Sequence, residues 1–135
     1  MLAFLARYVA VLIPFVVIDM IWLGQMAPRF YKPILGDIAL AGFRFAPAIA
    51  FYLMFPVGVV LFVLNPALKS QSLLTALTFG ALFGLFTYGT YDLTNQATLR
   101  NWTWSLSLAD MAWGGVLTGV SAAVAYLILS RLHLA

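Results

Sequence analysis

The sequence predicts an all-α integral membrane protein built as a four-helix bundle. Hydrophobic residues make up 64% of its 135 residues and charged residues 8%, against about 25% in an ordinary soluble domain. A soluble chain of this length could not bury so much apolar surface. Four apolar stretches approach the roughly 20 residues that a helix needs to cross the hydrocarbon core. We expect these helices at approximately 2–23, 46–64, 73–93 and 106–129, within one transmembrane domain of residues 1–135.

The first span resembles a signal peptide only at its start, where Arg7 precedes an apolar stretch. Its later part is bulky, contains Asp19 and lacks a small-residue cleavage site, so we expect it to be retained. The longest loop is then residues 24–45, which is amphipathic enough to lie among lipid headgroups. We expect the second helix to end at Asn65-Pro66, because proline cannot continue its hydrogen-bond ladder.

The third and fourth spans each carry a G-x-x-x-G pattern, at Gly80 and Gly84 and at Gly115 and Gly119. Small residues let helix backbones approach closely in lipid. The pattern favours packing of these two spans within one chain, and a dimer interface is the alternative.

Several classes of chemistry are excluded or disfavoured by composition. The chain has no cysteine, and its one histidine, His133, is third from the C-terminal end. Thiolate chemistry and Cys-ligated metals are therefore excluded, and haem ligation has a poor candidate. No nucleotide-binding or hydrolase pattern occurs, and the basic residues are scattered. We expect no cofactor, no metal site and no nucleic-acid partner.

All four acidic residues are aspartates, and three of them fall inside or at the ends of predicted spans. Asp19, Asp92 and Asp110 belong to separate helices, and helix direction places all three near the membrane face opposite the termini. Asp19 and Asp110 should lie roughly 6–8 Å inside their helix ends, with Asp92 nearer the end. Ionisable residues within a membrane are costly and mark functional sites by default.

Aromatic and amide side chains accompany these aspartates at helical spacing. Asp19 and Trp22 share one helix face, as do Asp110 and Trp113, because each pair is three residues apart. The predicted ligand-binding set consists of Asp19, Trp22, Tyr88, Tyr91, Asp92, Asn95, Asp110 and Trp113, with Arg44 and Arg100 at the rim.

Three interpretations of this cluster remain open from the residues alone. It is a structural network of carboxylates satisfied by tryptophan, tyrosine and arginine, or a site for binding or transport, or a catalytic site. The absence of an obvious nucleophile or base makes an enzyme the weakest of the three, and no catalytic residue is assigned. We favour the binding, or movement, of a membrane lipid or small amphiphile. The rivals are a cation- or proton-coupled transporter, an accessory subunit of a larger membrane complex, and a lipid-modifying enzyme.

The chain resembles an uncharacterised bacterial family of small four-span inner-membrane proteins, known as a domain of unknown function. The resemblance covers essentially the whole chain and is carried by the segments Asp19-x-x-Trp-Leu-Gly, Tyr88-Gly-Thr-Tyr-Asp-Leu-Thr-Asn-Gln-Ala-Thr-Leu and Asp110-Met-Ala-Trp-Gly. It implies a multi-pass location in the bacterial inner membrane and little about activity. The family pattern singles out the residues of the predicted cluster together with Gly24 and Gly114.

Overall fold

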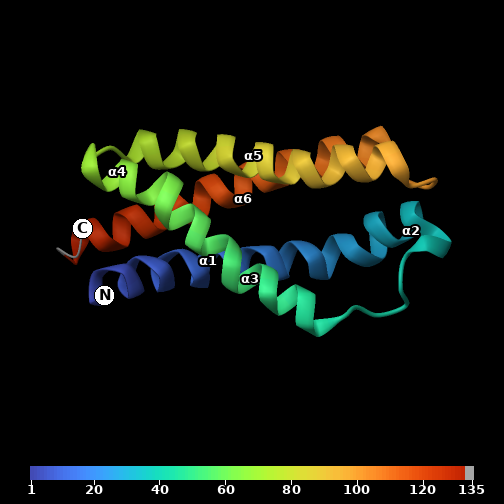
Figure 1. Ribbon diagram of the computed structural model, residues 1–135, viewed down its shortest axis with the longest axis horizontal. Helices are drawn as coiled ribbons and strands as arrows, with labels where there is room; N and C mark the ends of the chain where they lie inside the picture. The colour runs from blue at the N-terminus through green and yellow to red at the C-terminus, as the bar shows by residue number, and fades with distance from the viewer. Residues whose placement is uncertain (133–135) are drawn as a thin grey trace.

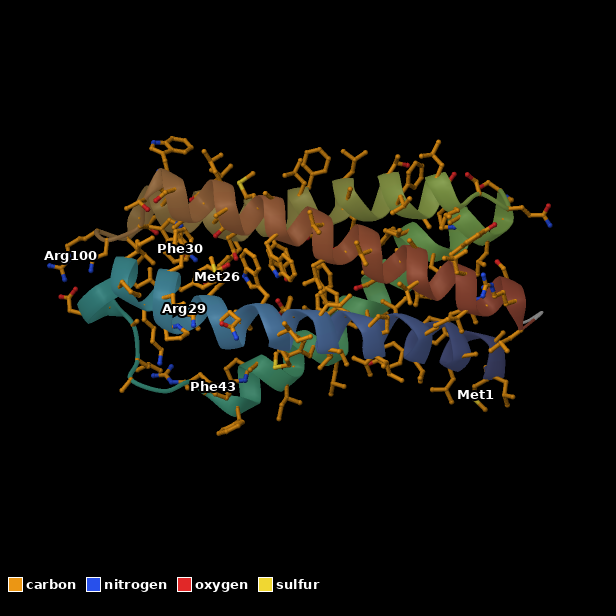
Figure 2. The ribbon with its side chains drawn as sticks, turned by 180° about the vertical axis from the view of Figure 1, so that it is seen from behind. Met1, Met26, Arg29, Phe30, Phe43 and Arg100 are labelled. Atoms are coloured by element: carbon orange, nitrogen blue, oxygen red, sulfur yellow. The ribbon has the colours of Figure 1, made fainter. Side chains whose placement is uncertain are left out.

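The computed structural model describes residues 1–132, and His133 lies outside the described residues. Four long helical segments run along one axis, with both chain ends at the same end of the molecule (Figure 1). They cover Leu2–Ile38, Phe45–Lys69, Leu73–Thr98 and Trp104–Arg131, and each is long and apolar enough to cross a membrane. The predicted all-α fold with four spans is confirmed. Met1 and Arg100 mark the two opposite ends of the bundle (Figure 2).

The first and second spans are longer than the sequence predicted. Helix α1 covers Leu2–Met26, and helical turns continue as η1 (Ala27–Tyr31), α2 (Lys32–Leu35) and η2 (Gly36–Ile38). In the second span α3 (Phe45–Val59) continues through η3 (Val60–Leu64) into α4 (Asn65–Lys69). Much of the expected loop at 24–45 is therefore helical, and Asn65-Pro66 does not end its helix.

A wide helical turn precedes Pro66, where the second helix was expected to stop, and another precedes Pro33, beyond the expected end of the first helix near residue 23. The Lys32 N–H bonds to the carbonyl of Ala27, and the Asn65 N–H bonds to the carbonyl of Val60, each five residues back. The next residue is a proline in both cases, which has no N–H and crowds the carbonyl four residues before it. Widening the turn to π geometry relieves that clash, and the chain continues as a helix past both prolines.

Helices α5 (Leu73–Thr98) and α6 (Trp104–Arg131) pack against each other along most of their lengths. A Cβ added to Gly80 would lie 2.8 Å from the Cα of Gly119, and one added to Gly84 would overlap the carbonyl of Gly114. The predicted intramolecular packing of small residues is thus observed. Each helix begins with a hydroxyl cap, because Ser72 accepts from the Thr75 N–H and Thr103 from the Leu106 N–H.

The apolar core occupies the half of the bundle that carries the termini. It is formed by side chains of α1, α3, η3 and α6 that are almost fully buried, among them Phe15, Val59, Val63, Leu117 and Leu129. Helix α3 crosses α1 obliquely rather than running parallel to it (Figure 1). The other half of the bundle holds the three aspartates.

We predict that Gly84→Ala destabilises the bundle, because the new methyl group would meet the backbone of α6. Overpacking of this kind costs about 1–3 kcal/mol. Thermal unfolding of the purified protein in detergent measures the effect. Gly24→Ala is the matched control, since a Cβ there meets nothing within 4 Å. Equal unfolding temperatures for the two variants would contradict the close approach.

Candidate functional site

The three aspartates of the cluster lie at one level of the bundle and are buried. Asp19 is seven residues before the end of α1, Asp92 six before the end of α5, and Asp110 six after the start of α6. These spacings correspond to roughly 9–10 Å of helix. Their side chains are 5%, 0% and 9% exposed, respectively. Asp92 is deeper than the sequence suggested, because α5 continues to Thr98 rather than ending near residue 93.

Asp19 is satisfied by two aromatic donors from other helices. The Tyr52 hydroxyl, from α3, donates to one carboxylate oxygen at 2.6 Å. The Trp113 indole N–H, from α6, donates to the other at 2.9 Å. Through these two hydrogen bonds Asp19 joins α1, α3 and α6 at a single point.

Asp110 is satisfied through a two-step chain from α1. The Tyr31 hydroxyl donates to Asp110 at 2.5 Å, and the Trp22 indole N–H donates to the Tyr31 oxygen at 3.0 Å. The rings of Trp22 and Trp113 stack with centroids 4.2 Å apart and planes 6° from parallel.

The two Asp-x-x-Trp segments are therefore reciprocal. Trp113 of α6 donates directly to Asp19 of α1. Trp22 of α1 donates to Tyr31, which in turn donates to Asp110 of α6. Because α1 and α6 run in opposite directions, similar local sequences can face each other in this way. The resemblance between the segments reflects this shared geometry.

Asp92 differs from the other two aspartates. Both of its carboxylate oxygens are buried, and no donor from the described part of the chain reaches either one. The side chain that interacts with it is the carboxyl of Asp110, and a hydrogen bond between two carboxyl groups requires them to share one proton. The nearby Ser107 hydroxyl donates instead to the Gln96 side-chain oxygen at 2.8 Å and to the Asp92 backbone carbonyl at 3.4 Å.

The remaining residues of the predicted set surround this centre unevenly. Tyr88 packs on Gly114, where an added Cβ would overlap its ring, and stands edge-on to Phe55 at 6.1 Å. Tyr91 is exposed and stands edge-on to Trp102 at 5.4 Å, while Asn95 is half-buried. The structure thus brings Asp19, Trp22, Tyr88, Asp92, Asp110 and Trp113 together, with Tyr91 and Asn95 at the edge.

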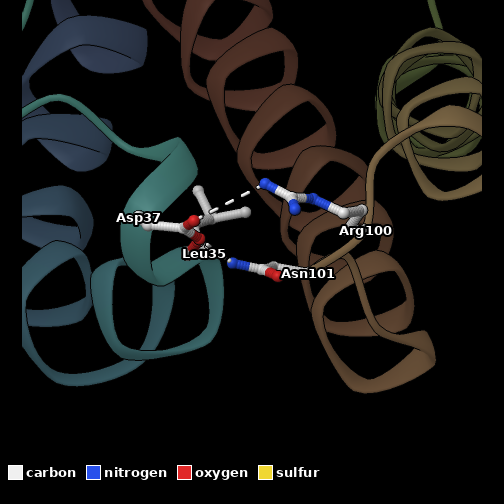
Figure 3. A network of polar contacts seen from close by, with 4 residues as sticks. All are labelled: Leu35, Asp37, Arg100 and Asn101. Carbon is white, nitrogen blue, oxygen red and sulfur yellow. Dashed lines mark hydrogen bonds and ion pairs between the residues drawn. The ribbon is translucent and has the colours of Figure 1, made fainter.

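The two predicted rim arginines do not pair with the buried aspartates. Arg100 forms an exposed ion pair with Asp37 at 3.5 Å, the one ion pair among residues 1–132. The Asn101 amide beside it donates to the Leu35 carbonyl at 2.5 Å and to Asp37 at 2.8 Å (Figure 3). These contacts fasten the end of the first span to the loop between α5 and α6. Arg44 is exposed at the residue preceding α3.

Tyr31 and Tyr52 belong to the site, although the sequence reasoning did not select them. Tyr31 was assigned to a headgroup loop because the first helix was expected to end near residue 23. Tyr52 lies alone in an apolar span, and its only sequence signal is its polar hydroxyl there.

The carboxyl groups of the cluster act mainly as hydrogen-bond acceptors. Asp19 and Asp110 already receive donors from aromatic side chains, and Asp92 receives none from the described residues. In the described chain, no three His, Asp or Glu side chains converge closely enough to hold a metal ion.

We predict that Tyr52→Phe destabilises the protein by about 1–2 kcal/mol, because it leaves a buried carboxylate oxygen of Asp19 without a donor. Unfolding in mixtures of dodecylmaltoside and dodecyl sulfate measures the change. Tyr8→Phe is the control, since the Tyr8 hydroxyl donates to the Leu53 carbonyl in an exposed bond. Tyr8→Phe should lower the free energy of unfolding less than Tyr52→Phe does. Equal decreases in the two variants would argue against a stabilising role for the Asp19 network.

Comparison with known proteins identifies the family to which the chain belongs. No curated protein and no solved structure matches the chain. The family model described as "Predicted membrane protein (DUF2177)" matches residues 4–127, which is most of the sequence. The chain therefore belongs to the DUF2177 family of predicted membrane proteins.

Proposed function

We propose that this protein binds a membrane lipid or other small amphiphile, whose polar head lies at the aspartate–aromatic cluster. The observation that carries the proposal is Asp92, which is fully buried with both carboxylate oxygens lacking a donor in the described chain. A buried polar group without a partner is destabilising, and a buried charge more so. A ligand that donates hydrogen bonds would remove that cost.

The chemistry of the unfilled positions favours a head that carries an amine or a hydroxyl. The charged side chain that interacts with Asp92 is the carboxyl of Asp110. An anionic head, as expected from rim arginines, would meet carboxylates at the cluster itself. Arg100 is meanwhile engaged with Asp37 at the surface.

The aromatic side chains suit an amphiphile. The rings of Trp22 and Trp113 stack on each other beside the aspartates, and their N–H groups donate to Tyr31 and Asp19. Sites for small molecules combine aromatic side chains with a few placed polar groups. The helical spans and the family resemblance support a location in the bacterial inner membrane, since outer-membrane spans are β-barrels.

A cation- or proton-coupled transporter is the second candidate, because the same unpartnered carboxylate could take a small cation. This function requires flux through reconstituted vesicles that Asp92→Asn abolishes. Retention of a lipid without any flux would favour the binding role.

Native mass spectrometry of the protein extracted in mild detergent tests the proposal. Wild-type protein should retain a defined lipid or small molecule, and Asp92→Asn should retain it roughly tenfold less, because leaving a buried hydrogen-bonding group without its partner costs about 1–3 kcal/mol. The retained mass would also identify the ligand class.

Asp37→Asn is the matched control, since Asp37 is exposed and lies at the end of the bundle beyond the cluster. It should retain the ligand as the wild type does. A ligand-free wild-type protein, or equal retention in both variants, would overturn the proposal. A stoichiometric protein partner would favour the accessory-subunit role instead.

A further inference from the structure

An apolar groove of about 500 Å³ runs between α1 and α3 on the outside of the bundle. Helix α3 crosses α1 obliquely (Figure 1), and the two are joined near the crossing by hydrogen bonds from Tyr8 to Leu53 and from Tyr52 to Asp19. Helices that cross at an angle diverge on either side of the contact. The groove occupies such a wedge, between residues 12–20 of α1 and residues 49–53 of α3.

The walls of the groove identify what it can hold. Ile13, Val17 and Ile49 on its walls are exposed and apolar, and Tyr52 is its only lining residue with a polar side chain. The groove lies within two membrane spans, where the surrounding medium is hydrocarbon. Neither water nor a polar ligand would be stable against such walls. The occupant that fits this chemistry is a hydrocarbon chain.

The groove is continuous with the candidate site through one side chain. Tyr52 lines the groove, and its hydroxyl donates to Asp19 at 2.6 Å. Asp19 in turn accepts from Trp113, whose ring stacks on Trp22. A chain lying in the groove would contact Tyr52, which is hydrogen-bonded to Asp19 of the aspartate cluster.

We propose that the α1–α3 groove holds one hydrocarbon chain of the amphiphile whose head binds at the aspartate cluster, with Tyr52 as the residue between the two parts. This inference rests on the proposed function. Lipid tails are as apolar as the groove walls, so burial of the chain adds little affinity. The head provides affinity, and the groove determines the orientation of the molecule and selects a single chain.

Photolabelling in vesicles tests the position of the chain. The full-length protein is reconstituted in phosphatidylcholine with a long-chain alkylamine that carries a diazirine in its chain, then illuminated and mapped by mass spectrometry. Label should concentrate on Ile13, Ile49 and Leu53. Val17→Trp, which fills the groove, should remove most of the label from these residues. Ile49→Trp repeats the test from the other wall should the first variant fail to fold.

Val116→Trp is the matched control, because Val116 is 56% exposed on α6 and Val17 is 53% exposed on α1. It should leave the labelling of the groove unchanged. Label spread evenly over the exposed residues of α1, α5 and α6 would overturn the inference, as would groove labelling that Val17→Trp does not reduce.

The Asp92→Asn variant separates this inference from the proposed function. Groove labelling that falls in Asp92→Asn supports one ligand with its head at the cluster and its chain in the groove. Groove labelling that persists in Asp92→Asn overturns that link.

If native mass spectrometry shows the alkylamine retained by the wild type and lost in Asp92→Asn while the groove stays unlabelled, the proposed function stands and the groove inference fails. Retention by neither protein overturns the proposed function.

Discussion

A carboxylate buried inside a membrane protein must find its hydrogen-bond donors within the protein, and this requirement organises one half of the bundle. Water and lipid cannot satisfy Asp19 and Asp110 at their depth, so aromatic side chains from three helical segments converge on them. Tyr31 can take part only because the first span continues as a helix beyond α1. The wide turn at Ala27–Tyr31 therefore both accommodates the following proline and positions a donor for α6.

Close packing of α5 and α6 provides the frame in which these donors meet. Glycines at the contact let the two backbones approach, and Tyr88 rests against Gly114 at the same level as the aspartates. The first span then docks on α6 through the reciprocal Asp-x-x-Trp segments. Its far end is fastened by Asn101 and by the ion pair of Arg100 with Asp37 (Figure 3). Glycine packing thus sets the distance between α5 and α6, and the polar contacts join the first two spans to this pair.

The sequence predicted the four spans and most of the cluster, because both depend on length, apolarity and helical spacing. It did not predict where the first two helices end: the second passes the proline expected to stop it through a π turn, and the first continues beyond residue 23 and passes Pro33 through another. The error at the first span also hid Tyr31. Tyr52 was missed for a different reason, because its partner Asp19 is 33 residues away and only the crossing of α3 over α1 brings them together.

The three aspartates distinguish a structural network from a binding site. Asp19 and Asp110 fit a structural network, since described donors reach both oxygens of Asp19 and one oxygen of Asp110 and join helices together. Asp92 contributes nothing of this kind, because its carboxylate holds no donor within residues 1–132. The hydroxyl best placed to help it, that of Ser107, donates to Gln96 and to the backbone. A residue that only stabilised the fold would be better replaced by an apolar one at this position, where a lone buried carboxylate is costly. The ligand proposed above would supply the donor that Asp92 lacks among the described residues.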